Sequence, residues 1–175
     1  MILLSETKLT EKCYQSYHPN LENYTFKKVK SKSYFGGVGV FYRDSLTCDI
    51  RRDLNCSEYK LFEMLWFDIS VKTASEKTTI GIIYRHGGSP SIPYFTSRIE
   101  SILNKLNREK NNYYIFGYWN INLLKIREIT NISDFVNSMH SHSTLNLVNK
   151  PTRFPIGNQT EALLYLIMCG LTNHI

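Results

Sequence analysis

An amphipathic helix followed at once by a buried strand constrains the fold of this chain most. Phe95, Ile99, Leu103 and Leu106 recur at helical spacing, and the charged residues Arg98, Glu100, Lys105 and Arg108 fall on the other side. Asn111-Asn112 ends this helix, and residues 113–116 resume as a buried strand that reaches a glycine. A helix with one apolar stripe must cover an apolar surface, so this pairing indicates a layered mixed α/β domain.

Other strands are expected on both sides of this helix. Aromatic residues make up 13% of the chain, and they suit the pleated surface of a sheet. The expected strands cover residues 2–4, 36–42, 61–71 and 78–84 before the helix, and 145–148 and 162–168 after it. A second helix is expected near Ser133, whose hydroxyl can cap it. Turns at Asp44-Ser45 and at residues 75–77 favour a meander of neighbouring strands.

Size and charge limit what the chain can be. Its 175 residues suffice for one domain with a core, which we expect to cover residues 1–175. The net charge of +6 suits a polyanionic partner such as nucleic acid, although many proteins are mildly basic. The lysines at 27, 28, 30 and 32 form the clearest basic cluster. This cluster is interpreted as a solvated loop, with a phosphate-contacting edge as the alternative.

The cysteines and the N-terminus exclude several classes of protein. The four cysteines show no CxxC pair and no histidine at zinc-ligand spacing, so we expect no zinc. Their scatter is typical of a reducing compartment. The first residues, MILLSETKLT, have too short an apolar run for a signal peptide, and no window approaches the length of a membrane span.

Several short motifs, in order along the chain, carry a family resemblance. The segment YYIFGYWNINLL at 113–124 resembles the GD(F/W)N motif of the endonuclease/exonuclease/phosphatase superfamily, particularly the endonuclease domain of LINE-type (non-LTR) retrotransposons. SET at 5–7, GGVGV at 36–40 with RDS at 43–45, YR at 84–85 and PTR at 151–153 resemble further motifs of these endonucleases. TNH at 172–174 resembles a decayed SDH. Each motif is weak alone, but the ordered set spans essentially the whole chain.

The resemblance implies a fold and a chemistry. The expected fold is a four-layer αββα sandwich of two mixed sheets flanked by helices. The resemblance also predicts that the first strand and the C-terminal end are missing, so the domain is partial. Such enzymes hydrolyse phosphodiesters with Mg²⁺, which neutralises charge on the phosphate. A carboxylate deprotonates the attacking water, and a histidine stabilises the transition state.

Five positions match functional residues of these endonucleases. Glu6 matches the glutamate that binds the metal. Tyr84 matches a tyrosine that contacts the scissile phosphate, and Asn120 matches the asparagine of the GDxN motif. Thr152 matches a threonine near the phosphate. His174 matches the catalytic histidine, although a histidine so close to the C-terminus is more often a frayed-end residue. The other histidines, including His86, are expected in loops or on the surface.

Three positions depart from the resemblance, and each replaces an aspartate. Tyr118 stands where these endonucleases carry the aspartate that activates water. A phenol is neutral at pH 7 and is a poor base or metal ligand. Tyr165 stands at a second aspartate position, within an apolar run, where it is expected to be a core aromatic. Asn173 replaces the aspartate beside the catalytic histidine.

These departures predict a Mg²⁺-dependent DNA endonuclease domain of a retrotransposon by descent, with impaired catalysis. The alternatives are a catalytically dead DNA-binding module, a non-functional relic, or a small-molecule phosphodiesterase or phosphatase. DNA is the expected partner, and no membrane contact is expected. An intact element would also carry a reverse transcriptase, which this chain lacks. Nuclear residence is expected from the resemblance alone.

Overall fold

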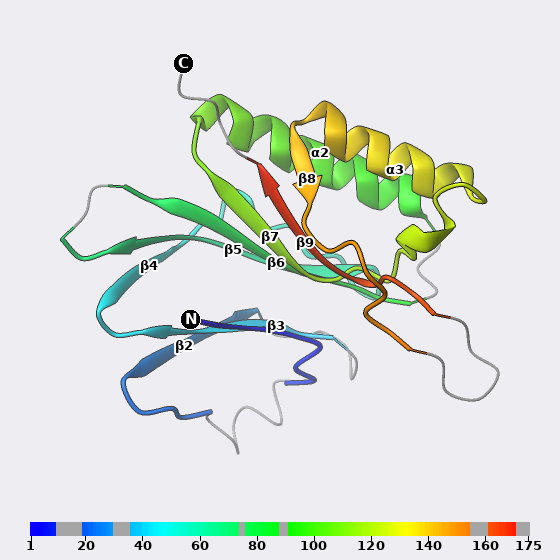
Figure 1. Cartoon of the computed structure of the whole chain (residues 1–175). Helices are drawn as coiled ribbons and strands as arrows, with labels where there is room; N and C mark the ends of the chain where they lie inside the picture. Colours follow the sequence, from blue (N-terminus) through cyan, green and yellow to red (C-terminus); the bar gives the residue numbers. More distant parts are fainter. Residues whose placement is uncertain (10–18, 30–35, 74–75, 88–90, 155–160, 171–175) are drawn as a thin grey trace.

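Two facing β-sheets with helices on one side make up the computed structural model of this chain (Figure 1). It describes residues 1–9, 19–29, 36–73, 76–87, 91–154 and 161–170. The smaller sheet has the strand order β1-β3-β2, and the larger has the order β4-β5-β6-β7-β9-β8. The strands are β1 Ile2–Ser5, β2 Tyr24–Val29, β3 Val38–Arg43, β4 Leu46–Ile50, β5 Phe62–Val71, β6 Thr78–Arg85, β7 Tyr113–Tyr118, β8 Thr144–Asn146 and β9 Tyr165–Gly170.

The amphipathic helix and the buried strand after it, which the sequence predicted, are confirmed. Helix α2 covers Ile92–Glu109, and Ser91 caps it by accepting a hydrogen bond from the Tyr94 backbone N–H at 3.0 Å. The apolar stripe of α2 packs on the larger sheet, beside helix α3 (Thr130–Ser141). Strand β7 follows and pairs parallel with β6, so α2 is a crossover connection.

Both described helices lie on the same face of the larger sheet, and the smaller sheet covers the other face (Figure 1). The described residues therefore form three layers, and the fourth, helical layer of the predicted sandwich is not among them. Helix α3 begins at Thr130 after Ile129, with no side-chain cap bond, so the prediction of a cap at Ser133 is wrong. A 3₁₀ turn at Leu123–Lys125 precedes it.

The predicted meander is wrong at Asp44-Ser45. This turn carries the chain from β3 in the smaller sheet to β4 in the larger sheet, so the two strands do not pair. Sequence alternation could not reveal this change of layer, because both strands alternate in the same way. The second predicted turn does link hydrogen-bonded neighbours, since β5 pairs antiparallel with β6.

The core has two parts, one on each face of the larger sheet. Trp66, Phe95, Trp119 and Phe135 lie among the fully buried side chains between the larger sheet and the helices. Val38, Val40, Leu65, Phe67 and Ile82 fill the space between the two sheets. Cys48 lies in this second part, and burial raises the pKa of its thiol to about 11. We infer that Cys48 is a structural thiol.

The basic cluster is partly built into the smaller sheet. Lys27 and Lys28 belong to β2 and are not in a loop. The Lys27 ammonium donates to the Cys48 carbonyl and lies 5.4 Å from the Tyr42 ring centre. The solvated-loop interpretation is wrong for these two residues, and lysines 30 and 32 lie outside the described residues.

No helix in the described part of the chain is long and apolar enough to span a bilayer.

Candidate functional site

One end of the sandwich collects the positions that the sequence analysis singled out. Strands β6 and β7 run parallel and end together, and β9 begins there because it runs antiparallel to β7. Strand β1 lies over β6 and β7 and ends at Ser5 (Figure 1). The backbone that follows β1 is held by a hydrogen bond of 3.1 Å from the Thr7 N–H to the Gly37 carbonyl. Glu6, Tyr84, Tyr118 and Tyr165 are therefore brought to a common end of the sheets.

Aromatic rings fill the space between the sheets at this end. Tyr84 is 5% exposed, and its ring stacks on Tyr118 with 5.9 Å between centres. The imidazole of His86 meets the Tyr84 ring edge-on at 4.9 Å. The phosphate contact predicted for Tyr84 stays a prediction, and the ring that faces Tyr84 here is a second phenol. Tyr118 packs here as an apolar ring.

A buried carboxylate stands beside these rings. Glu63 is the cross-strand partner of Tyr84 and is 5% exposed. One oxygen of Glu63 accepts a hydrogen bond from the Gly37 backbone N–H, and the other lies 3.8 Å from Nε2 of His86. That nitrogen is buried and has no hydrogen-bond partner among the described residues. The pair ties β5, β6 and the glycine turn before β3 into one unit.

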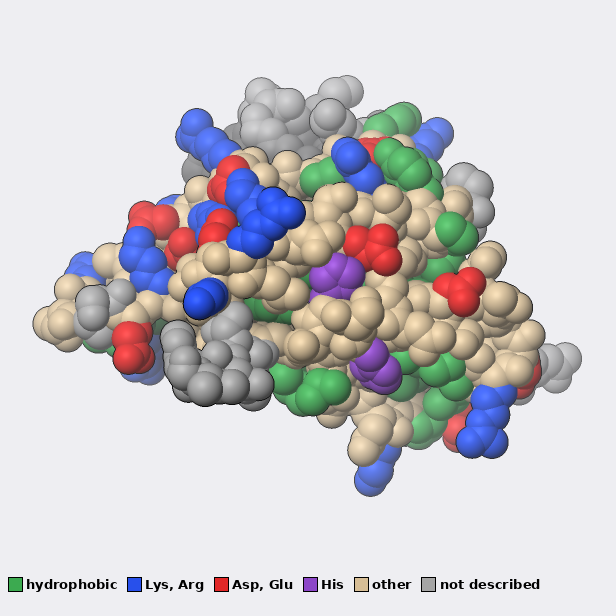
Figure 2. Space-filling view, turned by 90° about the horizontal axis from the view of Figure 1, so that it is seen from above, with side chains coloured by type: hydrophobic (Ala, Val, Ile, Leu, Met, Phe, Trp, Pro, Cys, Tyr) green, Lys and Arg blue, Asp and Glu red, His purple; other side chains and the backbone are tan. Residues whose placement is uncertain are grey.

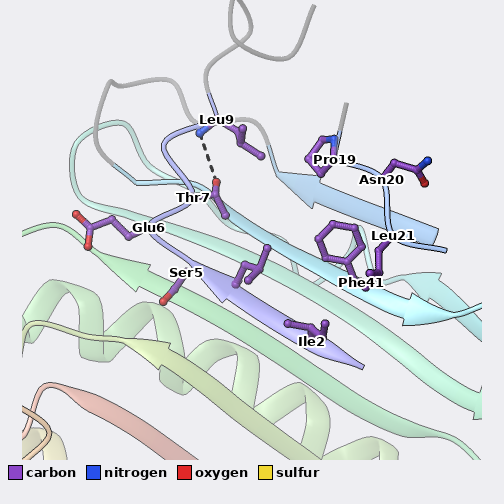
Figure 3. A pocket seen from close by; sticks show the side chains of 10 residues that line it. Ile2, Ser5, Glu6, Thr7, Leu9, Pro19, Asn20, Leu21 and Phe41 are labelled. Carbon is purple, nitrogen blue, oxygen red and sulfur yellow. Dashed lines mark hydrogen bonds between the residues drawn. The ribbon is translucent and has the colours of Figure 1, made fainter. Parts of the chain in front are cut away.

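Glu6 follows β1 with a backbone φ of +58°, a conformation that is uncommon for a residue with a side chain. It lies at the rim of a cleft on the smaller sheet that is lined mainly by apolar residues, including Ile2, Leu4 and Phe41. Figure 3 shows the Glu6 carboxylate pointing away from Phe41 and Leu21. This left-handed turn aims the carboxylate out of the apolar cleft, and the metal-binding role of Glu6 stays a prediction.

Asn120 and Arg85 lock the ends of β6 and β7 together. The Asn120 amide donates to the Arg85 carbonyl at 2.6 Å, and the Arg85 guanidinium donates to the Asn120 carbonyl at 3.2 Å. Arg85 is 4% exposed and lies 5.8 Å from the Phe95 ring centre, on the helical side of the sheet. Burial lowers the pKa of this guanidinium below its usual value. The Asn120 amide N–H₂ is therefore engaged by the backbone.

Thr152 is also used by the backbone. Its hydroxyl oxygen accepts a hydrogen bond from the Leu164 N–H at 3.0 Å, and its own N–H donates to the Ala162 carbonyl at 3.0 Å. The Thr152 side chain thus helps to fix the segment that leads into β9.

The two tyrosines that the resemblance aligns with aspartates are register partners. Tyr118 on β7 pairs with Tyr165 on β9 in the antiparallel register. The register therefore brings both positions to the site end of the larger sheet. Asn173 and His174 lie outside the described residues, and their predicted roles stay predictions.

The described residues offer a Mg²⁺ ion only a sparse set of ligands. This ion prefers hard oxygen ligands, commonly one or two carboxylates together with water. Within the described ranges, no three His, Cys, Asp or Glu side chains gather closely enough to hold a metal ion. Glu6 supplies one carboxylate, while the oxygens of Glu63 are engaged by Gly37 and His86. The donor set is poorer than the one the resemblance implies.

Sequence reasoning missed three polar residues at this end: Glu63, Arg85 as a buried residue, and His86. His86 follows the end of β6 in a loop, as predicted, but it is 9% exposed and therefore not a surface residue. One signal was present, because Glu63 interrupts the apolar run of residues 62–67 and a charge at such a position needs a partner. The partner's identity depends on the register with β6, which no local pattern gives.

The buried Glu63 makes a testable contribution to stability. Glu63→Ala leaves the Gly37 N–H without its acceptor, and an unpaired buried donor costs about 1–3 kcal/mol. Glu63→Gln keeps an acceptor oxygen, so its loss is expected to be smaller. Urea unfolding followed by circular dichroism measures both free energies of unfolding. Equal values for the two variants would contradict this role for the carboxylate oxygen.

No protein-family model matches this sequence, and no curated protein matches it either. Solved structures do match its fold. The endonuclease domain of TRAS1, a telomere-specific non-LTR retrotransposon, superposes with a TM-score of 0.60 at 9% identity, over 86% of this chain and 68% of that one. D. rerio TDP2 complexed with single strand DNA product gives 0.64 at 12%, over 99% and 71%.

A third match is the AP endonuclease LMAP from Leishmania major, with a TM-score of 0.67 at 12% identity, over 96% of this chain and 68% of the other. The sandwich of sheets is thus the fold of the endonuclease/exonuclease/phosphatase superfamily, as the motifs predicted. At these identities the likeness concerns the fold alone.

Proposed function

We propose that this chain is by descent a Mg²⁺-dependent DNA endonuclease domain of a non-LTR retrotransposon, and that its phosphodiester hydrolysis is impaired. One observation carries the proposal. Tyr118 and Tyr165 are cross-strand partners at the site end, where the resembling endonucleases carry aspartates. Loss of a general base alone costs about 10²–10⁴ in rate. The Tyr118 phenol, which stacks on Tyr84, is also bulkier than an aspartate at this position.

The surroundings support retained nucleic-acid binding. Tyr59 is 57% exposed just before β5, beside the end of β6, and the Lys60 ammonium lies 5.2 Å from its ring centre. An exposed ring next to a cation suits stacking on a base and contact with a phosphate. Phe154, which is 67% exposed, follows Arg153 in the segment that leads into β9. These features flank the same end of the sheets.

The helical face is a poor alternative for a nucleic-acid surface. Figure 2 views the molecule from above α2 and α3, where basic and acidic side chains intermingle. Lys105 pairs with Asp53 at 2.5 Å, and Arg98 pairs with Glu58 at 3.1 Å. Cations already paired with carboxylates release few counterions when a phosphate approaches. Binding of nucleic acid at the site end is therefore favoured. Nuclear residence is part of the same proposal, because a retrotransposon domain implies it.

Nicking of supercoiled plasmid in Mg²⁺ tests the loss of hydrolysis. We expect the wild-type chain to leave the plasmid intact. Tyr118→Asp and the double variant Tyr118→Asp/Tyr165→Asp should restore slow nicking, because they return a base and a metal ligand. Adding Glu6→Ala to the double variant should abolish it again. Nicking by the wild type that disappears in Glu6→Ala would contradict the proposed impairment.

Binding in the same samples separates the binding module from a relic. A fluorescent single-stranded oligonucleotide should bind the wild-type chain, with an affinity that falls steeply as salt rises. Tyr59→Ala should weaken this binding by about 1–3 kcal/mol, the usual contribution of one stacked base. Tyr94→Ala, which removes a 43% exposed ring on α2, is the matched control. No binding by the folded wild type would favour the relic.

A further inference from the structure

The chain leaves the regular register of the smaller sheet directly after β1. Ser5 lies opposite Val38 in the pairing of β1 with β3, so an unbroken register would place Glu6 opposite Gly37. Thr7 takes that place instead, because its N–H donates to the Gly37 carbonyl at 3.1 Å. Glu6 is therefore an extra residue, as in a β-bulge. Bulges often lie beside active sites, where they re-aim a side chain.

This bulge has a strained backbone that needs support. Glu6 has a φ of +58° and Lys8 a φ of +55°. Residues with a side chain persist in this left-handed region only where the surrounding structure holds them. The Lys8 N–H donates to the Gly36 carbonyl at 2.7 Å, and the Thr7 hydroxyl accepts from the Leu9 N–H at 3.5 Å (Figure 3). The Gly36-Gly37 turn thus receives two bonds from the bulge.

The glycine turn is in turn anchored by Glu63, which belongs to the other sheet. The Gly37 N–H donates to one oxygen of the Glu63 carboxylate. A Cβ atom at Gly36 would lie 2.6 Å from that same oxygen, so the carboxylate packs against the bare backbone of the turn. Glu63 is 5% exposed on β5. A buried carboxylate in the larger sheet therefore supports a turn of the smaller one.

We propose that Glu63 is a positioning residue for Glu6. Its carboxylate holds the Gly36-Gly37 turn, and the turn holds the bulge that aims the Glu6 side chain. The second oxygen of Glu63 lies 3.8 Å from Nε2 of His86, which fixes the anchor to the end of β6. The proposal rests on the proposed function in one respect, since it takes Glu6 as a carboxylate of the nuclease site.

A positioning role and a purely structural role predict different results. Loss of a structural carboxylate lowers the stability of the whole domain, so amides throughout the core exchange faster together. Loss of a positioning carboxylate frees the bulge first, because the bulge depends on the glycine turn. Thr7 and Lys8 report this directly, since their N–H groups donate to the two carbonyls of the turn.

Amide hydrogen exchange followed by NMR tests the proposal. In Glu63→Ala, the Thr7 and Lys8 amides should exchange at least about tenfold faster relative to the amides of β6. Glu63→Gln keeps an acceptor oxygen at the same reach and should retain most of this protection. Met64→Ala is the matched control, because Met64 is fully buried on the same strand and packs toward the helices. It should show no selective effect on Thr7 and Lys8.

Glu63→Asp keeps the experiment decisive if Glu63→Ala does not fold. Aspartate keeps the negative charge but is one methylene shorter, so it should expose the Thr7 and Lys8 amides more than Glu63→Gln does. Unchanged protection of these two amides in both Glu63→Asp and Glu63→Ala would overturn the proposal. A selective loss of the same protection in Met64→Ala would overturn it as well.

Plasmid nicking adds a functional readout in the Tyr118→Asp/Tyr165→Asp chain. At a temperature where every variant is folded, adding Glu63→Ala should slow the restored nicking by about tenfold or more, because misplaced site groups lose rate. Adding Met64→Ala should leave the rate unchanged, and equal losses in the two would overturn the positioning role. A double variant that does not nick at all contradicts the proposed function alone, and the exchange of Thr7 and Lys8 still decides the role of Glu63.

Discussion

Gly117→Ala is expected to abolish stable folding, with a loss of about 4 kcal/mol or more in the free energy of unfolding. The reason is close contact between two strands. Gly117 is the register partner of Ile83 in the parallel pair of β6 and β7. A Cβ atom at Gly117 would stand 1.8 Å from the Ile83 carbonyl oxygen. The strands cannot separate to admit it without breaking the centre of the larger sheet.

The backbone angle adds to this cost. Gly117 has a φ of +152°, which side-chain-bearing residues rarely adopt. Gly87→Ala is the matched control, because a Cβ atom there would meet the Asn120 side chain at an ordinary 3.8 Å. Thermal unfolding by circular dichroism compares the two variants. A melting temperature for Gly117→Ala close to that of Gly87→Ala would show that the close approach in β6–β7 does not limit substitution.

Gly117 also illustrates what the sequence could predict. The motif at 113–124 marked the glycine, and periodicity placed β7 correctly, since alternation and helical spacing are local properties of the chain. The assignment of strands to the two sheets could not be predicted from such local properties. Asp44-Ser45 looks like a hairpin turn, but the chain changes layers there because β3 completes the inner face of the smaller sheet. That choice depends on distant partners, which no local pattern records.

The residues of the candidate site also divide into those that the sequence could predict and those that it could not. Glu6, Tyr84 and Tyr118 were found by motif, and the structure brings them to one end of the sheets because β1, β6 and β7 all end there. The buried pair of Glu63 and His86 was missed, since its two members are 23 residues apart in sequence and meet only through the register of β5 with β6. Pairing across strands defines such sites, and spacing along the chain does not.

Trp119→Ala is expected to cost about 3–5 kcal/mol of folding stability and to loosen the candidate site with it. Trp119 is fully buried, and its ring lies edge-on to Phe95 and to Phe135, each at 5.6 Å between centres. The backbone N–H of Trp119 donates to the Leu164 carbonyl at 3.0 Å, which holds the segment before β9. Removing the ring leaves a cavity where α2, α3 and the end of β7 meet.

Loss of the Trp119 ring should also disturb the candidate site, because Trp119 directly precedes Asn120. Arg85 reaches the Asn120 carbonyl at 3.2 Å, and the Asn120 amide returns a bond to the Arg85 carbonyl at 2.6 Å. A mobile residue 119 would weaken this lock. In Trp119→Ala, amide exchange of residues 119–123 should therefore accelerate more than the global loss of stability predicts.

Two further variants serve as comparisons for Trp119→Ala. Trp119→Phe keeps a ring and removes an indole N–H that has no hydrogen-bond partner among the described residues, so it should cost less than Trp119→Ala. Phe154→Ala removes a ring that is 67% exposed and should change stability by no more than about 0.5 kcal/mol. Urea unfolding measures all three. If Trp119→Ala matched Phe154→Ala, then Trp119 would not anchor the end of β7, and the lock between Arg85 and Asn120 would have to hold the site end without it.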